Sequence, residues 1–574
     1  MSEKNDIFRA VTESLGTNGE GIVRHEGVTF FVPYCLPGEK AEIRVLKVKD
    51  GIGYGRAEEI LTPAEERVRE KCPVFRRCGG CQLQHLDYPQ QLVFKGKLVK
   101  DALKKIGGIE FDVPPAVKSD RAYAYRNKLQ LPIGVDREGN TVVGFYAERS
   151  HRIVPINACP IHPEWAEKVV AAVKRYVLEC AVKGYDEEKK TGALRHIVAR
   201  EIDGRFIVTL VSATEKLPNL DFFVKLLKEA LGEVTLWLNI NAAPMNVIFG
   251  KEFHLVHGAG FFEGTEQGIR YEAGPVTFLQ VNEGVRNKLY RAALEGVAET
   301  GNEVVVDAYS GGGLLTAMLA KRCKRVYGIE LEAEAVKCAD SLKAKNDLKN
   351  MTNICGKVEE KLDGVLAKEK GETVRLILDP PRAGIARSVL KAILASGIER
   401  VVLISCNPAT LARDLGILAG RLQEKDGSDG GELVKCSTPT GVRYEIESIQ
   451  PYDMFPQTKH VETLVCLSKK TEKHINIDVE FGEGEGQLSL KKLQEELNEQ
   501  KPKKKTTYKD IQAYIEEKYG FKVHTAYIAE VKRDLGLPMY DAPNAVEELK
   551  RPRSHPTAEM VEAIKDALNH FEII

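Results

Sequence analysis

The sequence predicts a multidomain chain with a small N-terminal β-barrel, a central α+β module, an α/β domain and a C-terminal helical extension. Three observations predict this fold class. Short strand-like stretches with Gly-rich turns fill the first 62 residues, apolar runs alternate with helical patterns over residues 266–470, and helical spacing returns after residue 506. A chain of 574 residues is also too long for one hydrophobic core, so several domains are expected.

Residues 1–62 predict the barrel. Residues 21–23 and 28–32 flank Gly27 as the two arms of a hairpin do, and residues 41–45 alternate between apolar and polar side chains. Closely spaced strands of this kind suit a barrel of the oligonucleotide-binding (OB) kind. Any other small β-barrel fits the same pattern.

Residues 63–120 contain a cysteine-rich segment. Cys72, Cys78 and Cys81 have the spacing C-x5-C-x2-C, and Cys159 follows within Ala-Cys-Pro-Ile-His. Thiolates grouped in this way hold a soft metal. Zinc suits four cysteines, although a gap of five residues is longer than the roughly two to four that zinc ribbons use. Elsewhere the cysteines are unevenly spaced, which favours a reduced cytoplasm over a disulfide framework.

Residues 121–265 predict a central α+β module. Strand-like stretches at 195–200 and 206–211 occur together with helical spacing of apolar residues over 222–227. The composition alone assigns this module no chemistry.

The alternating strand and helix patterns of residues 266–470 predict an open parallel sheet with polar side chains at the strand ends. Apolar runs end at Asp307, at Glu330 and just before Asp379, and the carboxyl ends of such strands bind ligands. Glycines at 311–313 let backbone amides approach a ligand, and an acid ending the second strand suits hydrogen bonds to ribose hydroxyls. The loop lacks the G-x-G-x-x-G spacing, which argues against NAD, and a tight turn without a ligand is the alternative.

Cys406 follows the apolar run at residues 401–404 and precedes Asn-Pro, which cannot continue a central strand. The thiol is therefore expected at the mouth of its strand, in the crevice that also receives Asp379. The alternative is a small buried hydrophobe, which is the commonest role of a free cysteine.

Five segments occur in one order: Phe-Leu-Gln-Val-Asn at 278–282, Asp-Ala-Tyr-Ser-Gly at 307–311, Leu-Asp-Pro-Pro-Arg-Ala-Gly at 378–384, Ser-Cys-Asn-Pro-Ala-Thr at 405–410 and Asp-Met-Phe-Pro-Gln-Thr-Lys-His-Val-Glu at 453–462. In these segments the chain resembles the RNA uracil-5-methyltransferase family, from the N-terminus to about Lys470. The resemblance implies a Rossmann-like methyltransferase domain over residues 266–470 and a TRAM domain over residues 1–62.

The resemblance also implies a role for each matched residue. Cys406 would add to carbon 6 of uracil to make carbon 5 nucleophilic, and Glu462 would later remove the carbon 5 proton, with His460 as an alternative base. The cofactor S-adenosylmethionine would be bound by Gln280, Tyr309, Glu330 and Asp379. A [4Fe–4S] cluster would be held by Cys72, Cys78, Cys81 and Cys159. Many family members have cysteine where Ser310 stands, which is a departure of similar size.

RNA is the partner that the resemblance implies. 23S rRNA is the leading expectation, because a barrel together with four cysteines favours it. The alternatives are the same chemistry on the T-loop uridine of tRNA, and a non-catalytic iron–sulfur protein that binds nucleic acid. Lys+Arg and Asp+Glu each number 83, so a basic RNA-binding surface must be local. Residues 125–128, Tyr-Arg-Asn-Lys, are one candidate for contact with RNA phosphates. The alternative is that they form a solvated strand end without such a role.

The chain changes character after Lys470. Residues 471–505 predict a linker, with a Gly/Glu repeat at 481–486 and a lysine run at 501–505. Residues 506–574 predict three helices, which resemble a helix-turn-helix or form a docking module. The sequence predicts neither a signal peptide nor a bilayer-spanning run, so a cytoplasmic protein without a membrane partner is expected. A monomer is expected as well.

Overall fold

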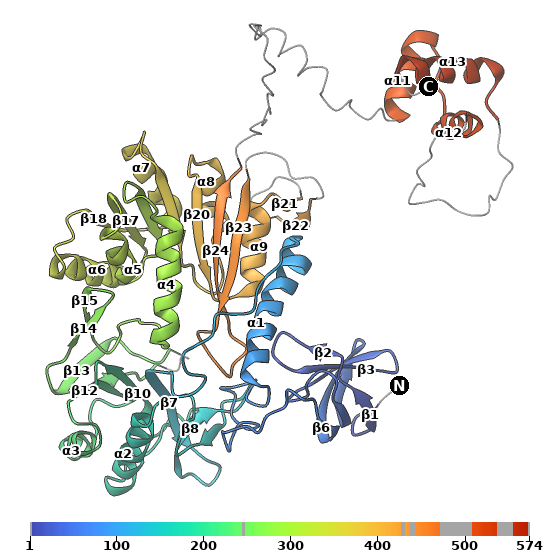
Figure 1. The fold of residues 1–574 in the computed structure, drawn as a ribbon. Coiled ribbons are helices and arrows are strands. Elements are labelled where there is room, and N and C mark those ends of the chain that lie inside the picture. Colours follow the sequence, from blue (N-terminus) through green and yellow to red (C-terminus); the bar gives the residue numbers. More distant parts are fainter. Residues whose placement is uncertain are drawn as a thin grey trace, which may run out of the picture. The chain divides into compact units, whose positions relative to one another are not determined.

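The computed structural model describes residues 3–243, 247–425, 431–436, 443–470, 508–535 and 555–571. The chain divides into two units, Met1–Lys473 and His474–Ile574. The first unit contains three large sheets, and helix α1 (Tyr88–Ala102) runs between the cysteine-rich segment and the α/β domain (Figure 1). In the described part of the chain, no helix is long and apolar enough to cross a membrane.

The N-terminal sheet has six strands in the order β1-β5-β6-β4-β3-β2. These are β1 (Ile7–Val11), β2 (Ser14–Leu15), β3 (Gly21–His25), β4 (Val28–Val32), β5 (Lys40–Lys49) and β6 (Ile52–Thr62). Their inward side chains, Phe30 and Ile43 among them, form a hydrophobic core of their own. Gly53 lets β6 cross this core, because a Cβ atom there would lie 2.3 Å from the Phe30 ring. The predicted N-terminal β domain is confirmed.

Helix α1 begins at a capped N-terminus, where the side chain of Asp87 accepts the Gln90 N–H (3.0 Å) and Pro89 occupies the first turn. It continues into a π-helical turn, η1 (Leu103–Gly107), that packs on α9 (Pro408–Leu418). A Cβ atom at Gly107 would lie 2.5 Å from the Ala412 carbonyl oxygen, so glycine permits this close approach. The helix thus ties the cysteine-rich segment to the α/β domain.

The central module is a seven-stranded sheet in the order β13-β12-β11-β10-β7-β8-β9, with helices packed on it. The elements are β7 (Lys128–Val135), β8 (Thr141–Tyr146), β9 (Ile153–Pro155), α2 (Trp165–Glu179), β10 (Leu194–Ile202), β11 (Arg205–Ser212), α3 (Leu220–Leu231), β12 (Val234–Ile240) and β13 (Glu252–His257). A hairpin, β14 (Phe262–Glu266) and β15 (Ile269–Ala273), leads into the next domain. The predicted α+β character is confirmed, while the exact domain boundaries remain predictions.

The α/β domain has one sheet in the order β18-β17-β16-β19-β20-β24-β23. Its strands are β16 (Val304–Ala308), β17 (Arg325–Glu330), β18 (Met351–Cys355), β19 (Val374–Leu378), β20 (Arg400–Ser405), β23 (Tyr444–Tyr452) and β24 (Glu462–Lys469). Its helices are α4 (Glu283–Val297), α5 (Leu314–Ala320), α6 (Ala333–Lys345), α7 (Val358–Lys368), α8 (Arg387–Ala395) and α9, and a small pair, β21 (Leu422–Glu424) and β22 (Leu433–Lys435), lies beside them. Strands β16 to β20 are parallel, whereas β24 runs antiparallel to β20.

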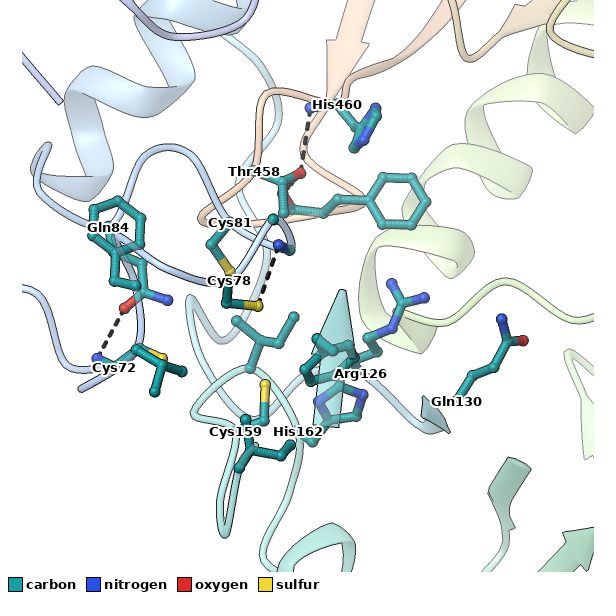
Figure 2. A pocket seen from close by; sticks show the side chains of 18 of the residues that line it. Cys72, Cys78, Cys81, Gln84, Arg126, Gln130, Cys159, His162, Thr458 and His460 are labelled. Carbon is teal, nitrogen blue, oxygen red and sulfur yellow. Dashed lines mark hydrogen bonds between the residues drawn. The ribbon is translucent and has the colours of Figure 1, made fainter. Parts of the chain in front are cut away.

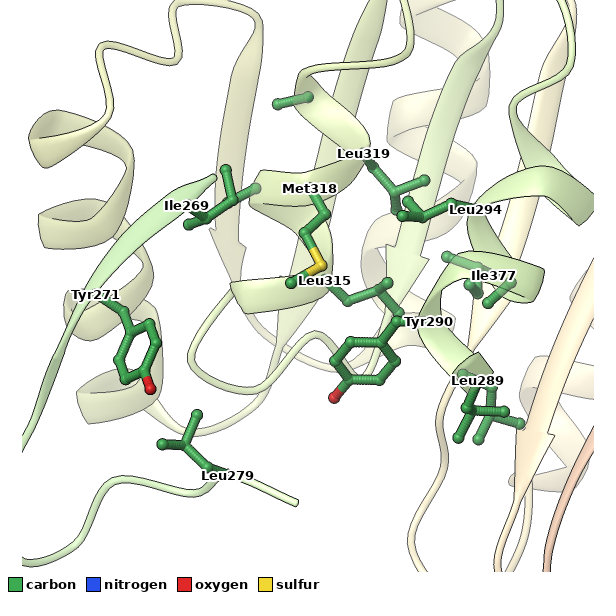
Figure 3. Close-up of a cluster of buried hydrophobic side chains, with 14 of the residues drawn as sticks. Ile269, Tyr271, Leu279, Leu289, Tyr290, Leu294, Leu315, Met318, Leu319 and Ile377 are labelled. Atoms are coloured by element: carbon green, nitrogen blue, oxygen red, sulfur yellow. The ribbon is translucent and has the colours of Figure 1, made fainter. Parts of the chain in front are cut away.

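Both faces of this sheet are buried, which explains why its strands are continuous apolar runs. Alternate residues such as Val305 and Ile377 face α4, α5 and α6, and Figure 3 shows the cluster that they form with β15. The intervening residues, such as Val304 and Leu376, face α7, α8, α9 and the C-terminal part of α1. The sheet is therefore held rigidly, and its strand ends are fixed positions for polar side chains.

The second unit contains three described helices, α11 (Tyr508–Tyr519), α12 (Thr525–Asp534) and α13 (Ala558–His570). They share a small core that includes Ile515, Ile528 and Ile564. These are the three helices that the sequence predicts, and the first ends at Gly520, whose φ of 75° suits glycine. The predicted linker features at 481–486 and 501–505 lie outside the described residues.

Candidate active site

Three adjacent strands bring a thiol and two carboxyl groups to one edge of the α/β sheet. Asp379 follows β19 and Cys406 follows β20, and these strands are parallel neighbours in which Leu378 pairs with Leu403. Strand β24 runs the other way, so its first residue, Glu462, lies at the same edge, next to the Ser405–Thr463 pair. The sequence predicted a shared crevice for Asp379 and Cys406, and the antiparallel strand adds Glu462 to it.

Glu462 is buried and Asp379 is half-buried, and removal from water disfavours the charged forms of both carboxyl groups. Burial raises the pKa of Asp379 to about 7. Burial and the nearby charge of Asp379 together raise the pKa of Glu462 to about 8, against the opposing effect of Arg382. A carboxyl with a pKa near the working pH can both hold and accept a proton, as general catalysis requires.

Arg382 is a residue whose role the sequence reasoning missed. Burial, Glu462 and Asp379 raise the pKa of the Cys406 thiol, and Arg382 opposes them. Its position is fixed by Asn407, whose side chain donates to the Arg382 carbonyl (3.1 Å) and accepts the Ala409 N–H (3.0 Å) as the cap of α9. The sequence could have indicated this role, because Arg382 belongs to the Asp-Pro-Pro-Arg segment at a strand end.

The glycine loop between β16 and α5 is tied to the end of β17. Glu330 accepts the Gly311 N–H (2.9 Å) on one carboxylate oxygen and the Glu332 N–H (2.9 Å) on the other. A carboxylate accepts about four hydrogen bonds, so capacity remains for ribose hydroxyls. Cβ atoms placed at Gly311 and Gly312 would meet no atom within 4 Å, so the loop backbone faces open space. This donor set fits the ribose and amino-acid parts of S-adenosylmethionine.

The remaining predicted cofactor residues lie around this loop. Tyr309 starts it in a left-handed conformation, with φ of 64°, and its half-buried side chain packs on the core beside α7 to α9. Gln280 is half-buried in the segment before α4, two residues after Phe278, whose side chain is 78% exposed. Asp307 lies buried beneath the loop, where it accepts the Thr316 hydroxyl (2.6 Å), and burial raises its pKa to about 7. Among the described residues, no hydrogen bond joins the side chain of Gln280 or Tyr309 to Cys406.

A second feature is a cavity of about 340 Å³ (Figure 2). All four predicted metal-binding cysteines line it: Cys72, Cys78, Cys81 and Cys159. Burial raises the pKa of Cys81 and of Cys159 to about 12, so these thiols stay protonated unless a positive group binds them. Arg382 and His460 also line the cavity, which therefore adjoins the active site.

The arrangement of the four thiols bears on which metal fits. Among the described residues, no three His, Cys, Asp or Glu side chains are close enough to share one metal ion. Zinc requires four ligands within about 2.3 Å of one point. The four thiols line one cavity, and the cluster that the resemblance implies there stays a prediction.

His460 is a weaker candidate base than Glu462. Burial, Arg382 and Lys459 lower the pKa of His460 to about 4, so the imidazole is neutral at physiological pH. Its backbone N–H donates to the Thr458 hydroxyl (3.3 Å). A base of such low pKa accepts a proton less readily than Glu462 does.

Comparison with known proteins decides the family. The sequence profile described as tRNA (Uracil-5-)-methyltransferase matches residues 260–423, and the TRAM domain profile matches residues 2–58. An uncharacterized RNA methyltransferase of Halalkalibacterium halodurans is 38% identical over 471 residues, which are 81% of this chain and 98% of that protein. The chain belongs to the RNA uracil-5-methyltransferase family. A relative described in the same words from Clostridium tetani is 36% identical over 82% of this chain and 98% of its own length.

A solved structure extends the family comparison to the fold. The Pyrococcus abyssi tRNA (uracil-54, C5)-methyltransferase, in complex with S-adenosyl-L-homocysteine, has a TM-score of 0.62 and 27% identity, and covers 80% of this chain and 99% of its own. This protein is thus an S-adenosylmethionine-dependent RNA methyltransferase with an N-terminal TRAM domain. This membership sets aside the non-catalytic alternative.

Proposed function

We propose that the enzyme methylates carbon 5 of a uridine in 23S rRNA through a covalent cysteine–uracil adduct. One observation supports this proposal above all: Cys406 and Glu462 share one edge of the sheet, next to Asp379 and the glycine loop. A nucleophile and a base on neighbouring strands match the two ends of such a reaction.

Cys406 acts first. Its thiolate forms a bond to carbon 6 of uracil, and the electron pair of the C5=C6 double bond moves to give an enolate with a nucleophilic carbon 5. Arg382 favours the thiolate electrostatically, against the burial and acidic neighbours that disfavour it. S-adenosylmethionine, when bound, supplies an electrophilic methyl group that carbon 5 takes, with S-adenosylhomocysteine as the leaving product.

Glu462 acts last. Its carboxylate takes the proton from carbon 5, the electron pair of the broken C–H bond re-forms the C5=C6 double bond, and the bond from Cys406 to carbon 6 breaks. The thiolate is then regenerated. Glu330 and the glycine-loop amides are proposed to hold the cofactor, together with Gln280, Tyr309 and Asp379.

The target uridine must be unpaired or flipped, because a paired base is out of reach of a thiol at a sheet edge. The TRAM domain and the half-buried residues 126–128 are proposed to contact the surrounding RNA, whereas Tyr125 is buried. A tRNA substrate is the second candidate, because the matched Pyrococcus abyssi enzyme acts on uracil 54 of tRNA.

Loss of the gene is expected to remove one or more 5-methyluridines from 23S rRNA and to leave tRNA unchanged. The measurement is mass spectrometry of nucleosides from separately purified rRNA and tRNA of the deletion strain and its parent. Re-expression of the intact gene should restore the modification. Loss from tRNA alone would instead support the second candidate.

We propose that Cys72, Cys78, Cys81 and Cys159 hold a [4Fe–4S] cluster with a structural role. Such a cluster would bind the thiolates of segment 72–81 and of Cys159, and so fix the cysteine-rich segment on the central module. Protein purified without oxygen is expected to be brown and to contain iron and sulfide in equal amounts.

The matched control for this prediction is Cys180→Ser, a half-buried cysteine at the end of α2 that lies outside the cavity. Cys81→Ser should lose most of the iron, whereas Cys180→Ser should keep it. Zinc without sulfide in the intact protein would contradict the cluster.

A further inference from the structure

The loop that delivers Glu462 is held from outside the α/β domain. Residues 453–461 join β23 to β24 and end directly at Glu462. At the centre of the loop lies Gln457, which is 2% exposed and has a φ of 70°. A residue other than glycine keeps such a conformation only where its surroundings enforce it.

Gln91 of α1 restrains Gln457 through two hydrogen bonds. Its side-chain oxygen accepts the backbone N–H of Gln457 (3.0 Å), and its Nε2 donates to the Gln457 side-chain oxygen (3.0 Å). The same Nε2 also lies within hydrogen-bond distance of the carbonyls of Leu83 (3.1 Å) and Leu86 (2.8 Å), so its two protons are shared among three acceptors. Both glutamines are buried. If the hydrogen bonds between them break, no water molecule takes the place of the lost partner, and the buried amide groups stay unsatisfied.

The cysteine-rich segment also forms hydrogen bonds to this loop. Gln82, the residue after Cys81, and Leu83 both donate their backbone N–H groups to the Gln457 carbonyl (3.1 and 3.0 Å). The Gln82 side chain accepts the Lys459 N–H (3.3 Å), one residue before His460. The loop is thus fixed by the segment that contains Cys78 and Cys81.

A buried ion pair anchors the start of the loop. Lys95, one turn beyond Gln91 on α1, pairs with Asp453, and both side chains are fully buried. The Lys95 ammonium also donates to the Phe455 carbonyl (3.0 Å). Two successive turns of α1 therefore hold the first half of the loop and its centre.

We propose that Gln91 is a positioning residue for proton abstraction by Glu462. The inference rests on the proposed function, in which Glu462 acts only after the methyl group has been transferred. Without the Gln91 amide, the backbone of Gln457 can leave its left-handed conformation, and the start of β24 shifts with it. Cys406 directly follows β20, outside the loop, so its attack on carbon 6 does not depend on Gln91. Proton transfer is sensitive to small displacements of the base.

The test compares Gln91→Met with Gln90→Met. Methionine keeps the length of the side chain and removes its hydrogen bonds. Gln90 is the neighbouring half-buried residue on α1, and its side chain takes no part in the hydrogen bonds found among the described residues. Two rates are measured for each protein: breakdown of the denaturant-resistant adduct with ordinary uridine RNA, and trapping of 5-fluorouridine RNA.

Gln91→Met is expected to slow adduct breakdown by about tenfold to a hundredfold, so that the methylated adduct accumulates, with the trapping rate within about twofold of wild type. Gln90→Met should match wild type in both rates. If both rates fall together in Gln91→Met, or neither changes, the positioning role is wrong. If wild type itself forms no trapped adduct, the proposed function fails first.

Thermal unfolding checks that the variants are folded. If Gln91→Met does not fold, Gln457→Ala removes one of the two amide hydrogen bonds and is expected to show the same selective defect. An unchanged breakdown rate in a folded Gln457→Ala protein, with Gln91→Met unfolded, would also overturn the proposal.

Discussion

Cys406→Ala is expected to abolish methylation, with a loss of about 10⁴-fold or more, because the variant lacks the thiol that forms the bond to carbon 6. Binding of S-adenosylhomocysteine should stay within about twofold of wild type, since the glycine loop and Glu330 are untouched. Methyl transfer is measured with a radiolabelled methyl donor and RNA that contains the target uridine, and binding by calorimetry.

The matched control is Cys338→Ala, an exposed cysteine on α6 of the same domain, which should remain active. RNA with 5-fluorouridine at the target should become attached to wild type and to Cys338→Ala in a form that resists denaturation. Fluorine cannot leave carbon 5 as a proton does, so the adduct persists. A Cys406→Ala protein that still methylates RNA would rule out the thiol as nucleophile.

Glu462→Gln is expected to stop the reaction at the methylated adduct. Glutamine has the shape of the acid and cannot accept the proton, so adduct breakdown should slow by about 10²- to 10⁴-fold. Adduct formation should change much less. Gel electrophoresis under denaturing conditions, with ordinary uridine RNA and the methyl donor, separates the two steps. Glu445→Gln, an exposed carboxylate on the adjoining β23, serves as the control.

The pH dependence follows from the pKa of Glu462, which burial and Asp379 raise to about 8. Below that pH the carboxyl is mostly protonated and cannot accept the carbon 5 proton. The rate of adduct breakdown should therefore rise about tenfold per pH unit toward 8 and level off above it. Glu462→Gln should lack this rise. A profile that instead rises near pH 4 would indicate His460, whose pKa burial lowers to about 4.

Part of this protein's chemistry can be predicted from its sequence, because several site residues directly follow the strands that position them. Each strand of the parallel part of the sheet is an apolar run that ends at a polar residue, and the end of a strand is where such sheets bind ligands. Asp379 and Cys406 could be assigned to one crevice on that basis. The five segments and their order also indicated the RNA uracil-5-methyltransferase family, and the comparisons confirm this membership.

Other parts of the site depend on contacts between residues far apart in the chain. Gln91 meets Gln457, and Lys95 meets Asp453, across more than 350 positions. A buried glutamine on a helix has no distinguishing pattern in a single sequence, because its partner is chosen by packing. The effect of Arg382 on the Cys406 thiol likewise required the positions of both side chains.

The sequence by itself determined the fold class, the strand ends that bear Asp307, Glu330, Asp379 and Cys406, and the grouping of the cysteines. Only the tertiary structure decided that β24 runs antiparallel to β20. An apolar run has the same pattern in either direction, so its sequence does not show which end meets the crevice. That direction puts the first residue of β24 beside the last of β20, and so brings Glu462 to Cys406.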